Sequence, residues 1–376
     1  MSVLAPLLDK IYALADKDLS EATSLPPEAY HSDALLHREI EQLFYQDWIC
    51  AGRADEIPNP YDYMSFDICD QPLILIRGED SMIRALSNLC RHRMMRLVTG
   101  TGNAKSFTCP YHAWCYHHDG HLISAPHMDK TACFDKKDIF LPEVKCEIYE
   151  GWIYVSLAPD ALPVSERLAA LTPLIVPYQM AAYQTIFQET HLWDCNWKSL
   201  TENFMESYHL PVAHQQTVGA DIVLDETSFA RDVTSPHFTY QYFTKADGAF
   251  VGTAHPDNTH LAGQARYRSV MPTIFPSHMY VLAPDHLWYL SLQPRGTGQV
   301  EIKYGAALAP EVLAASTDSE ALIAKVKSFL DQVQAEDRFL VESISQGARA
   351  PLAKQGPLSW LEAEAHDFTR YLARRL

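Results

Sequence analysis

Two short pairs of cysteine and histidine in the N-terminal half limit the fold of this chain more than any other feature. They are Cys90-Arg-His92 and Cys109-Pro-Tyr-His112, and 16 residues separate His92 from Cys109. Each pair lies beside segments with the short alternating pattern of strands. Two loops of a small β domain can therefore converge and bring four metal ligands together.

The ligand types favour one kind of metal centre over others. Two thiolates and two imidazoles fit a Rieske-type [2Fe–2S] cluster, in which cysteine binds one iron and histidine the other. A structural zinc site uses the same residue types, but its usual order is two cysteines followed by two histidines. We expect the other histidines of this region to be turn or surface residues; they are His117, His118, His121 and His127.

Charge and hydropathy exclude several classes of protein. The formal net charge is −17, which argues against a nucleic-acid binder and against docking on anionic lipid. No apolar run approaches the roughly 18 residues of a membrane span, and the first residues do not resemble a signal peptide. We therefore expect a cytoplasmic protein, where the 8 cysteines serve metal or redox chemistry rather than disulfides.

The pattern along the chain predicts an α+β protein in three parts. Residues 1–44 read as helices, with Ser32 as an N-cap, and residues 45–158 as an all-β domain. Residues 159–376 mix an antiparallel sheet with long helices. The individual elements expected are a hairpin over 72–77 and 82–86, a strand over 151–157, a meander over 279–282, 286–292 and 300–308, and helices over 197–208 and 319–346.

A second group of candidate ligands lies in the segment NWKSLTENFMESYHLPVAH, which starts at Asn196. We expect a helix whose apolar side is Trp197, Leu200, Phe204 and Tyr208. Glu206 and His209, three residues apart, would be neighbours on another face. Pro211 would end the helix and let the chain fold back, placing His214 beside His209. Two histidines are two thirds of the facial triad that holds non-haem Fe(II).

The third ligand should be a carboxylate, and Asp337 is the best candidate. It follows the apolar stripe of the C-terminal helix (333, 337, 340), so its side chain would point inward. A buried carboxylate needs a cation or another strong partner. Glu336 is the fallback but lies off the stripe, and an ion pair for Asp337 or a core role for the two histidines are the alternatives.

At these residues the sequence resembles the α subunit of Rieske non-haem iron oxygenases, which include aromatic ring-hydroxylating dioxygenases and quaternary-ammonium oxygenases. The resemblance rests on CRHR…CPYHAW, on ENFMESYH-x4-H and on ED-x4-ES-x2-QG from Glu336 to Gly347. It implies an N-terminal Rieske domain, a helix-grip-like catalytic domain on which the N-terminal helices pack, and commonly a head-to-tail homotrimer.

The resemblance also implies a role for each matching residue. Cys90, His92, Cys109 and His112 match the cluster ligands, and His209, His214 and Asp337 match the ligands of the mononuclear Fe(II). Glu206 matches the carboxylate that bridges the two centres, bonded to His209 and to a cluster histidine, here His112, of the neighbouring subunit. Electrons would then cross between subunits.

Two departures from the family pattern affect these expectations. Met94 replaces a glycine often found after CxHR, which leaves the ligands in place but can alter the loop and the cluster potential. Many ring-hydroxylating members have aspartate at the position of Glu206. Relatives that oxidise quaternary ammonium compounds such as carnitine have glutamate there, as this chain does. We therefore slightly favour a small quaternary or tertiary amine, such as carnitine, betaine or stachydrine, over an aromatic acid as the substrate.

The expected function is that of a terminal oxygenase that uses O₂. A separate NAD(P)H-dependent flavin or iron–sulfur reductase would supply electrons, because the chain has no GxGxxG and no C-x4-C-x2-C run. Aromatic side chains could cage a trimethylammonium group, or they could simply form the core; they are Tyr240, Tyr242, Phe243, Phe250, Tyr267, Phe275, Tyr280, Trp288 and Tyr289. An electron-transfer Rieske protein and a zinc-stapled binding module are the remaining alternatives.

Overall fold

The computed structural model describes residues 4–219, 233–245 and 252–376, and these form two compact units. Phe44–Val164 is one unit, here called the inserted unit. Met1–Leu43 and Ser165–Leu376 together form the other, the terminal unit. Within the described ranges, no helix is both long enough and apolar enough to cross a membrane.

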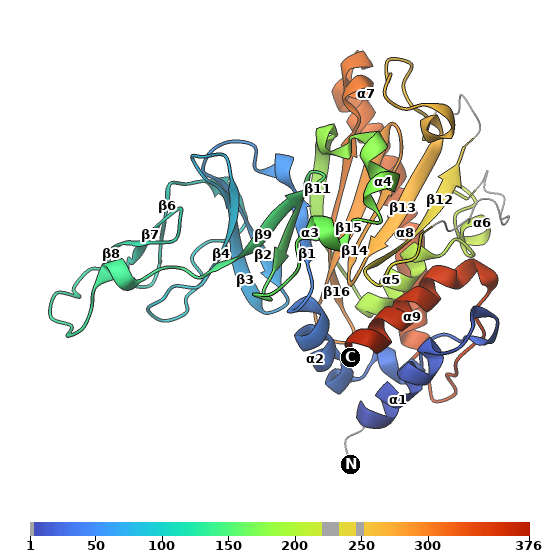
Figure 1. Ribbon diagram of the computed structural model, residues 1–376, viewed down its shortest axis with the longest axis horizontal. Coiled ribbons are helices and arrows are strands. Elements are labelled where there is room, and N and C mark those ends of the chain that lie inside the picture. The colour runs from blue at the N-terminus through green and yellow to red at the C-terminus, as the bar shows by residue number, and fades with distance from the viewer. Residues whose placement is uncertain (1–3, 220–232, 246–251) are drawn as a thin grey trace. The chain divides into compact units, whose positions relative to one another are not determined.

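The inserted unit consists of two antiparallel sheets (Figure 1). The larger sheet has, in spatial order, β1 (Ile49–Arg53), β10 (Trp152–Ser156), β9 (Glu143–Tyr149), β4 (Ile83–Ser87), β3 (Gln71–Arg77), β2 (Asp62–Ile68) and β5 (Thr101–Asn103). The smaller sheet has β6 (Ser106–Thr108), β7 (Cys115–His117) and β8 (Leu122–Ser124). The expected hairpin is β3–β4, and its apolar run is buried: Ile74 and Ile76 of β3 pack in a core cluster with Leu86 of β4.

A six-stranded antiparallel sheet forms the centre of the terminal unit. Its spatial order is β11 (Gln184–Trp193), β16 (Val300–Leu308), β15 (His286–Pro294), β14 (His278–Leu282), β13 (Arg268–Ile274) and β12 (Phe238–Thr244). The predicted meander is β14, β15 and β16, which pair with their chain neighbours in register. This confirms an antiparallel sheet in an α+β protein.

Three helices pack on this sheet, as Figure 1 shows. They are α5 (Trp197–Met205), α8 (Ser319–Gly347) and α9 (Ala363–Arg375). α5 contacts β13, β14 and β15 of the sheet, and it also contacts the helices α8 and α9. α8 begins one turn after α7 (Pro310–Ala315), where the Asp318 carboxylate accepts the backbone N–H of Ala321. An N-cap of this kind satisfies a backbone donor that would otherwise lack a partner.

The predicted helix over 197–208 is wrong at its C-terminal end. α5 stops at Met205, and Glu206 is extended, with φ −111° and ψ 155°. The Glu206 carboxylate accepts the backbone N–H groups of Tyr208 and His209, which replaces continued helical bonding. Pro211 lies in the first turn of a new short helix, α6 (Leu210–Ala213), where its missing N–H costs nothing. Tyr208 is 54% exposed and is therefore no core residue.

The N-terminal helices pack within the terminal unit. α1 (Leu4–Ala15) lies against α9 and buries Leu7, Ile11 and Leu14. α2 (Asp33–Glu39) has the expected Ser32 cap, which accepts the Leu35 N–H. The buried Glu39 carboxylate accepts from Trp197 Nε1 at 2.9 Å and pairs with Lys198 Nζ at 2.7 Å. This pairing fixes the start of α5, and with it the segment that leads to the candidate ligands.

Candidate metal centres

The two cysteine–histidine loops of the inserted unit fold alike. In the first, Cys90 N–H donates to Met95 O at 2.8 Å and Met94 N–H donates to Cys90 O at 2.9 Å. In the second, Cys109 N–H donates to Trp114 O at 2.7 Å and Ala113 N–H to Cys109 O at 3.0 Å. Met94 (φ 56°) and Ala113 (φ 57°) occupy the same left-handed position. Glycine adopts this conformation without strain, so the substitution of methionine at 94 has a local cost.

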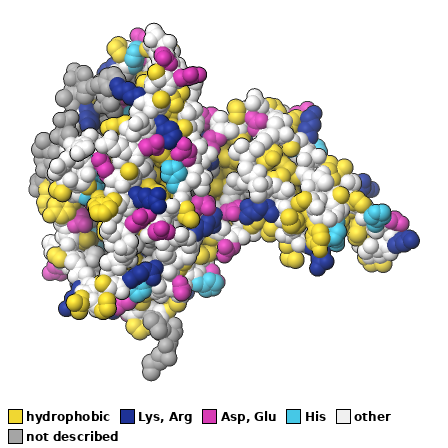
Figure 2. Space-filling model, turned by 180° about the vertical axis from the view of Figure 1, so that it is seen from behind, with side chains coloured by type: hydrophobic (Ala, Val, Ile, Leu, Met, Phe, Trp, Pro, Cys, Tyr) yellow, Lys and Arg dark blue, Asp and Glu magenta, His cyan; other side chains and the backbone are white. Residues whose placement is uncertain are grey.

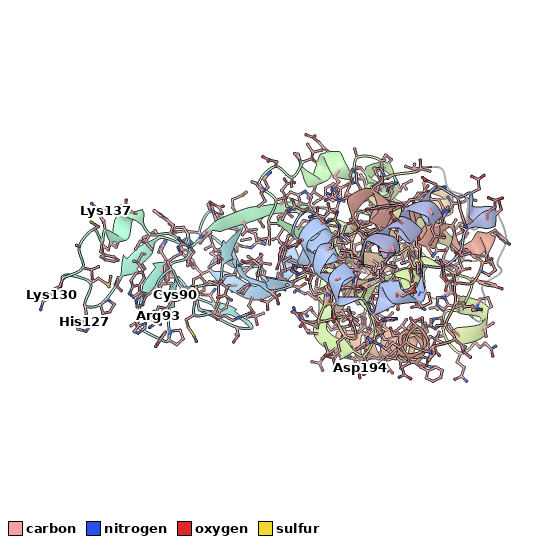
Figure 3. The ribbon with its side chains drawn as sticks, turned by 90° about the horizontal axis from the view of Figure 1, so that it is seen from below. Cys90, Arg93, His127, Lys130, Lys137 and Asp194 are labelled. Carbon is pink, nitrogen blue, oxygen red and sulfur yellow. The ribbon has the colours of Figure 1, made fainter. Side chains whose placement is uncertain are left out.

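The four candidate cluster ligands differ in their exposure to solvent. Cys90 and Cys109 are each 2% exposed, whereas His92 and His112 are exposed, with ring centroids 4.6 Å apart. No three ligand atoms of these four residues lie within 4.8 Å of one another, unlike two other groups in the described ranges. The pair of buried thiols and the pair of exposed imidazoles fit two metal positions, one held by sulfur and one by nitrogen. Figure 3 shows Cys90 and the exposed Arg93 in one loop.

Tyr116 is a residue of this centre that the sequence analysis missed. Its hydroxyl lies 3.3 Å from Cys90 Sγ and accepts the backbone N–H of Arg91 at 3.0 Å. Burial, with the hydrogen bond to Cys90, raises the pKa of Tyr116, so the phenol keeps its proton. The only sequence signal is a tyrosine on the strand that follows the second ligand pair.

The second group lies in the terminal unit, where His209, His214 and Asp337 bring one ligand atom each within 4.8 Å of the others. His209 precedes α6 and His214 follows it, so one short helix separates the two residues, and their ring centroids lie 5.2 Å apart. Asp337 Oδ1, on α8, is 3.5 Å from His209 Nε2 and 3.1 Å from His214 Nε2. The Asp337 side chain is 11% exposed and that of His214 only 1%.

Each of the two imidazoles also contacts a second carboxylate. His209 Nδ1 bonds to Glu206, and His214 Nδ1 lies 2.6 Å from Glu336 Oε2. Thr217 Oγ1 donates to the same Glu336 oxygen at 2.7 Å. Carboxylates in this position orient metal-binding histidines and raise their basicity. Glu336, the fallback ligand of the sequence analysis, therefore holds His214 from behind instead of facing the three converging atoms.

The electrostatics of this group favour a bound cation. Burial by itself lowers the pKa of His209, but Asp337 and Glu206 outweigh it and raise that pKa to about 9. Burial would raise the pKa of Asp337, yet hydrogen bonds from His209 and His214 leave it lowered. Without a metal, protons shared among these groups compensate the negative charge, and a divalent ion can replace them. The donor set of two nitrogens and one oxygen suits Fe(II).

The surrounding residues fix the backbone of this site. Gln241 on β12 donates through Nε2 to Met205 O at 3.0 Å and accepts from Ser207.

Most of the aromatic residues that the sequence analysis offered as a possible cage are buried in the terminal unit. Phe243 and Tyr267 are half-buried, and Phe250 lies outside the described residues. Trp288 packs edge-on against Phe204 of α5, with ring centroids 5.4 Å apart.

Two domain families match the chain. The family described as "Ring hydroxylating alpha subunit (catalytic domain)" matches residues 180–376, and "Rieske [2Fe-2S] domain" matches residues 47–135. The first covers more than half of the chain, which belongs to the ring-hydroxylating α-subunit family. The matches confirm the expected combination of a Rieske domain with a helix-grip-like catalytic domain. They also confirm the expected cofactors, one [2Fe–2S] cluster and one mononuclear iron.

The relatives are oxygenase subunits. The carnitine monooxygenase oxygenase subunit of Escherichia coli (strain K12) is 33% identical over 202 residues, 52% of this chain and 53% of the relative. The glycine betaine monooxygenase oxygenase subunit of Pseudomonas aeruginosa (strain UCBPP-PA14) is 31% identical over 239 residues, 63% and 54%. The match thus spans about half the length of these relatives. A quaternary ammonium Rieske monooxygenase solved with L-carnitine has the same fold (TM-score 0.79, 24% identity, 97% and 98% coverage).

Proposed function

We propose that this chain is the terminal oxygenase component of a multicomponent enzyme. It uses O₂ and electrons from a separate NAD(P)H-dependent flavin or iron–sulfur reductase to hydroxylate or N-demethylate a small organic substrate. The observation that carries the proposal is the convergence of His209, His214 and Asp337 in a chain of the ring-hydroxylating α-subunit family. Three protein ligands leave room in the coordination shell of an iron ion for O₂ beside a substrate.

We assign the cluster to Cys90, His92, Cys109 and His112, and the mononuclear iron to His209, His214 and Asp337. When bound, the cluster supplies single electrons and the iron activates O₂. The chain's own residues hold the geometry: Glu206 and Glu336 orient the two histidines, and Gln241 anchors the backbone before them. This arrangement limits rotation of the imidazoles, as efficient catalysis requires.

Glu206 is proposed to connect the two centres. One of its oxygens contacts His209 Nδ1, and the side chain is still 14% exposed, so a further donor can reach it. That donor would be His112 of a neighbouring subunit in a homotrimer, and electrons would cross the subunit boundary there. His112 is exposed within its own chain, as such a contact requires.

The domain assignment is also a proposal. Residues 45–158 would carry the cluster and residues 159–376 the iron, with the helices of 1–44 completing the second domain. The internal contacts, which group 44–164 apart from the rest, support this division. The expectation of a cytoplasmic protein continues to rest on the sequence.

The substrate is proposed to be a quaternary or tertiary amine of the carnitine or betaine kind. Support comes from Glu206 at the bridging position, from aromatic side chains able to hold a trimethylammonium group, and from relatives named after carnitine and glycine betaine. The alternative is hydroxylation of an aromatic compound such as an aromatic acid, in keeping with the ring-hydroxylating family as a whole.

The test is coupled turnover by the iron-loaded protein with NADH and a surrogate flavin reductase. Carnitine, glycine betaine, choline, stachydrine and aromatic acids are compared by O₂ uptake and by mass spectrometry of products. An amine that yields a stoichiometric hydroxylated or demethylated product supports the proposal. If only the aromatic acids are turned over, the amine substrate is rejected. If neither the amines nor the aromatic acids give a product, both proposed substrate classes are rejected. Asp337→Ala is the control for uptake that does not involve the proposed iron site.

A further inference from the structure

The turn between β7 and β8 contains a group of three side chains that the proposed reaction does not use. The sequence there is His117-His118-Asp119-Gly120-His121, and the group consists of residues 117, 119 and 121. Their ligand atoms lie within 4.8 Å of one another. Asp119 Oδ1 is 3.1 Å from His117 Nδ1 and 2.6 Å from His121 Nδ1.

This group differs from an ordinary surface ion pair in one respect. His117 Nδ1 is buried and has no hydrogen-bond partner, although it lies close to Asp119, because the two atoms are not aligned for a hydrogen bond. A buried ring nitrogen without a partner is costly. Tetrahedral ligands at about 2.0–2.1 Å from a zinc ion lie about 3.3 Å apart, which is close to the 3.1 Å between His117 Nδ1 and Asp119 Oδ1. The 2.6 Å between His121 Nδ1 and Asp119 Oδ1 is a hydrogen bond, which a bound ion would replace.

The backbone of the turn is held in place independently of any ion. His117 N–H donates to His121 O at 2.9 Å, and Gly120 N–H donates to His117 O at 2.9 Å. Gly120 has φ +93°, and a Cβ there would meet Leu141 O at 3.2 Å, so any other residue would be strained at this position. His121 N–H donates to Asp119 Oδ1 at 3.1 Å. Little conformational entropy is then lost when the three side chains bind an ion.

Two other histidines of this region do not belong to the group. The neighbouring His118 contacts Tyr61 edge-on, with ring centroids 5.1 Å apart, and is not one of the three. His127, labelled in Figure 3, belongs to the next loop and lies outside the group.

We propose that His117, Asp119 and His121 form an additional metal site, which binds a divalent transition-metal ion of the zinc class. Two imidazoles and one carboxylate suit Zn²⁺ and its neighbours, whereas Mg²⁺ and Ca²⁺ prefer all-oxygen sites. The side chains are 35%, 48% and 43% exposed, so water can complete the coordination. Figure 2 shows histidine side chains at the surface of the inserted unit, to which the site belongs. The site shares no residue with the two proposed iron centres.

The test uses Zn²⁺ as the probe on the full chain with its cluster intact. A His209→Ala background weakens zinc binding at the proposed iron site, and equilibrium dialysis with metal analysis counts zinc per chain. We expect one equivalent of zinc, with affinity reduced about tenfold or more by His117→Ala and by His121→Ala. His118→Ala, which removes the adjacent histidine, should bind zinc as the background protein does.

Two results would overturn the proposal. One is the absence of a stoichiometric zinc ion in the His209→Ala background, and the other is zinc binding that survives both His117→Ala and His121→Ala. Retained visible absorption of the cluster shows that each variant is folded, and His121→Gln replaces His121→Ala if the latter is not. Because the readout is bound zinc, the outcome does not depend on the proposed oxygenase activity.

Discussion

Replacing Tyr116 by phenylalanine should lower the reduction potential of the cluster proposed at Cys90. The Tyr116 hydroxyl lies 3.3 Å from Cys90 Sγ, and its oxygen already accepts the Arg91 N–H. Its own proton is therefore free to point at the sulfur. Because burial raises the pKa of Tyr116, the hydroxyl remains a donor at any working pH. A donor at a ligating sulfur favours the reduced cluster, which carries one more negative charge.

The size of the effect follows from the strength of that hydrogen bond. Hydrogen bonds to charged groups contribute about 1.5–3 kcal/mol, and only the difference between the two redox states changes the potential. Taking that difference as about 1.5 kcal/mol gives a decrease of about 65 mV for a one-electron couple, since a tenfold change in equilibrium constant corresponds to about 59 mV.

The assay is a redox titration of the purified protein followed by circular dichroism or electron paramagnetic resonance. The control is Tyr111→Phe, which removes a hydroxyl from a tyrosine of the same unit that is 55% exposed and packs on His112 at 3.8 Å between ring centroids. An unchanged potential in Tyr116→Phe, with an intact cluster spectrum, would refute the reasoning. An equal decrease in Tyr111→Phe would refute it as well.

Three further predictions concern carboxylates of the terminal unit. Glu206→Gln should keep the cluster and the iron but reduce turnover about tenfold or more, because the contact to His209 changes while no proposed metal ligand is lost. Glu336→Gln should weaken Fe(II) binding about 10- to 100-fold, since His214 loses its carboxylate partner; metal analysis after dialysis measures this. Glu202→Gln should change stability in a pH-dependent way. Burial raises the pKa of Glu202 to about 7, despite a 2.7 Å hydrogen bond from Tyr30 Oη, so the native state resists its ionisation. Wild-type stability should therefore fall as the pH rises from about 4.5 to about 7, and the variant should exceed it by up to about 3 kcal/mol at pH 8, but not at pH 4, in urea unfolding.

Each of these predictions has a contradicting result. Full turnover in Glu206→Gln with both metals present would exclude the bridging role. Equal iron loss in Glu320→Gln, which changes an exposed residue in the first turn of the same helix, would show that Glu336 does not act through His214. A stability difference for Glu202→Gln that is the same at pH 4 and pH 8 would exclude ionisation of Glu202 as its cause.

The sequence alone predicted the features that depend on local order. The hairpin β3–β4, the meander β14–β16 and the long helix α8 follow from periodicity within a few turns of chain. The residue types of the candidate ligands, and the inward position of Asp337 on α8, follow from spacing in the same way. Met94 illustrates the limit: its departure from the family pattern was visible in the sequence, but its left-handed backbone was not.

Only the tertiary structure decided which polar groups contact the candidate ligands. α5 ends at Met205 because the Glu206 carboxylate captures backbone N–H groups, and a helical pattern carries no trace of that. Glu336 meets His214 from 122 residues away, and Tyr116 reaches Cys90 across 26. The raised pKa of Glu202 likewise depends on Tyr30 and on the packing around it. Periodicity specifies which face of an element is buried, whereas the partner of a buried polar group depends on how separate elements pack.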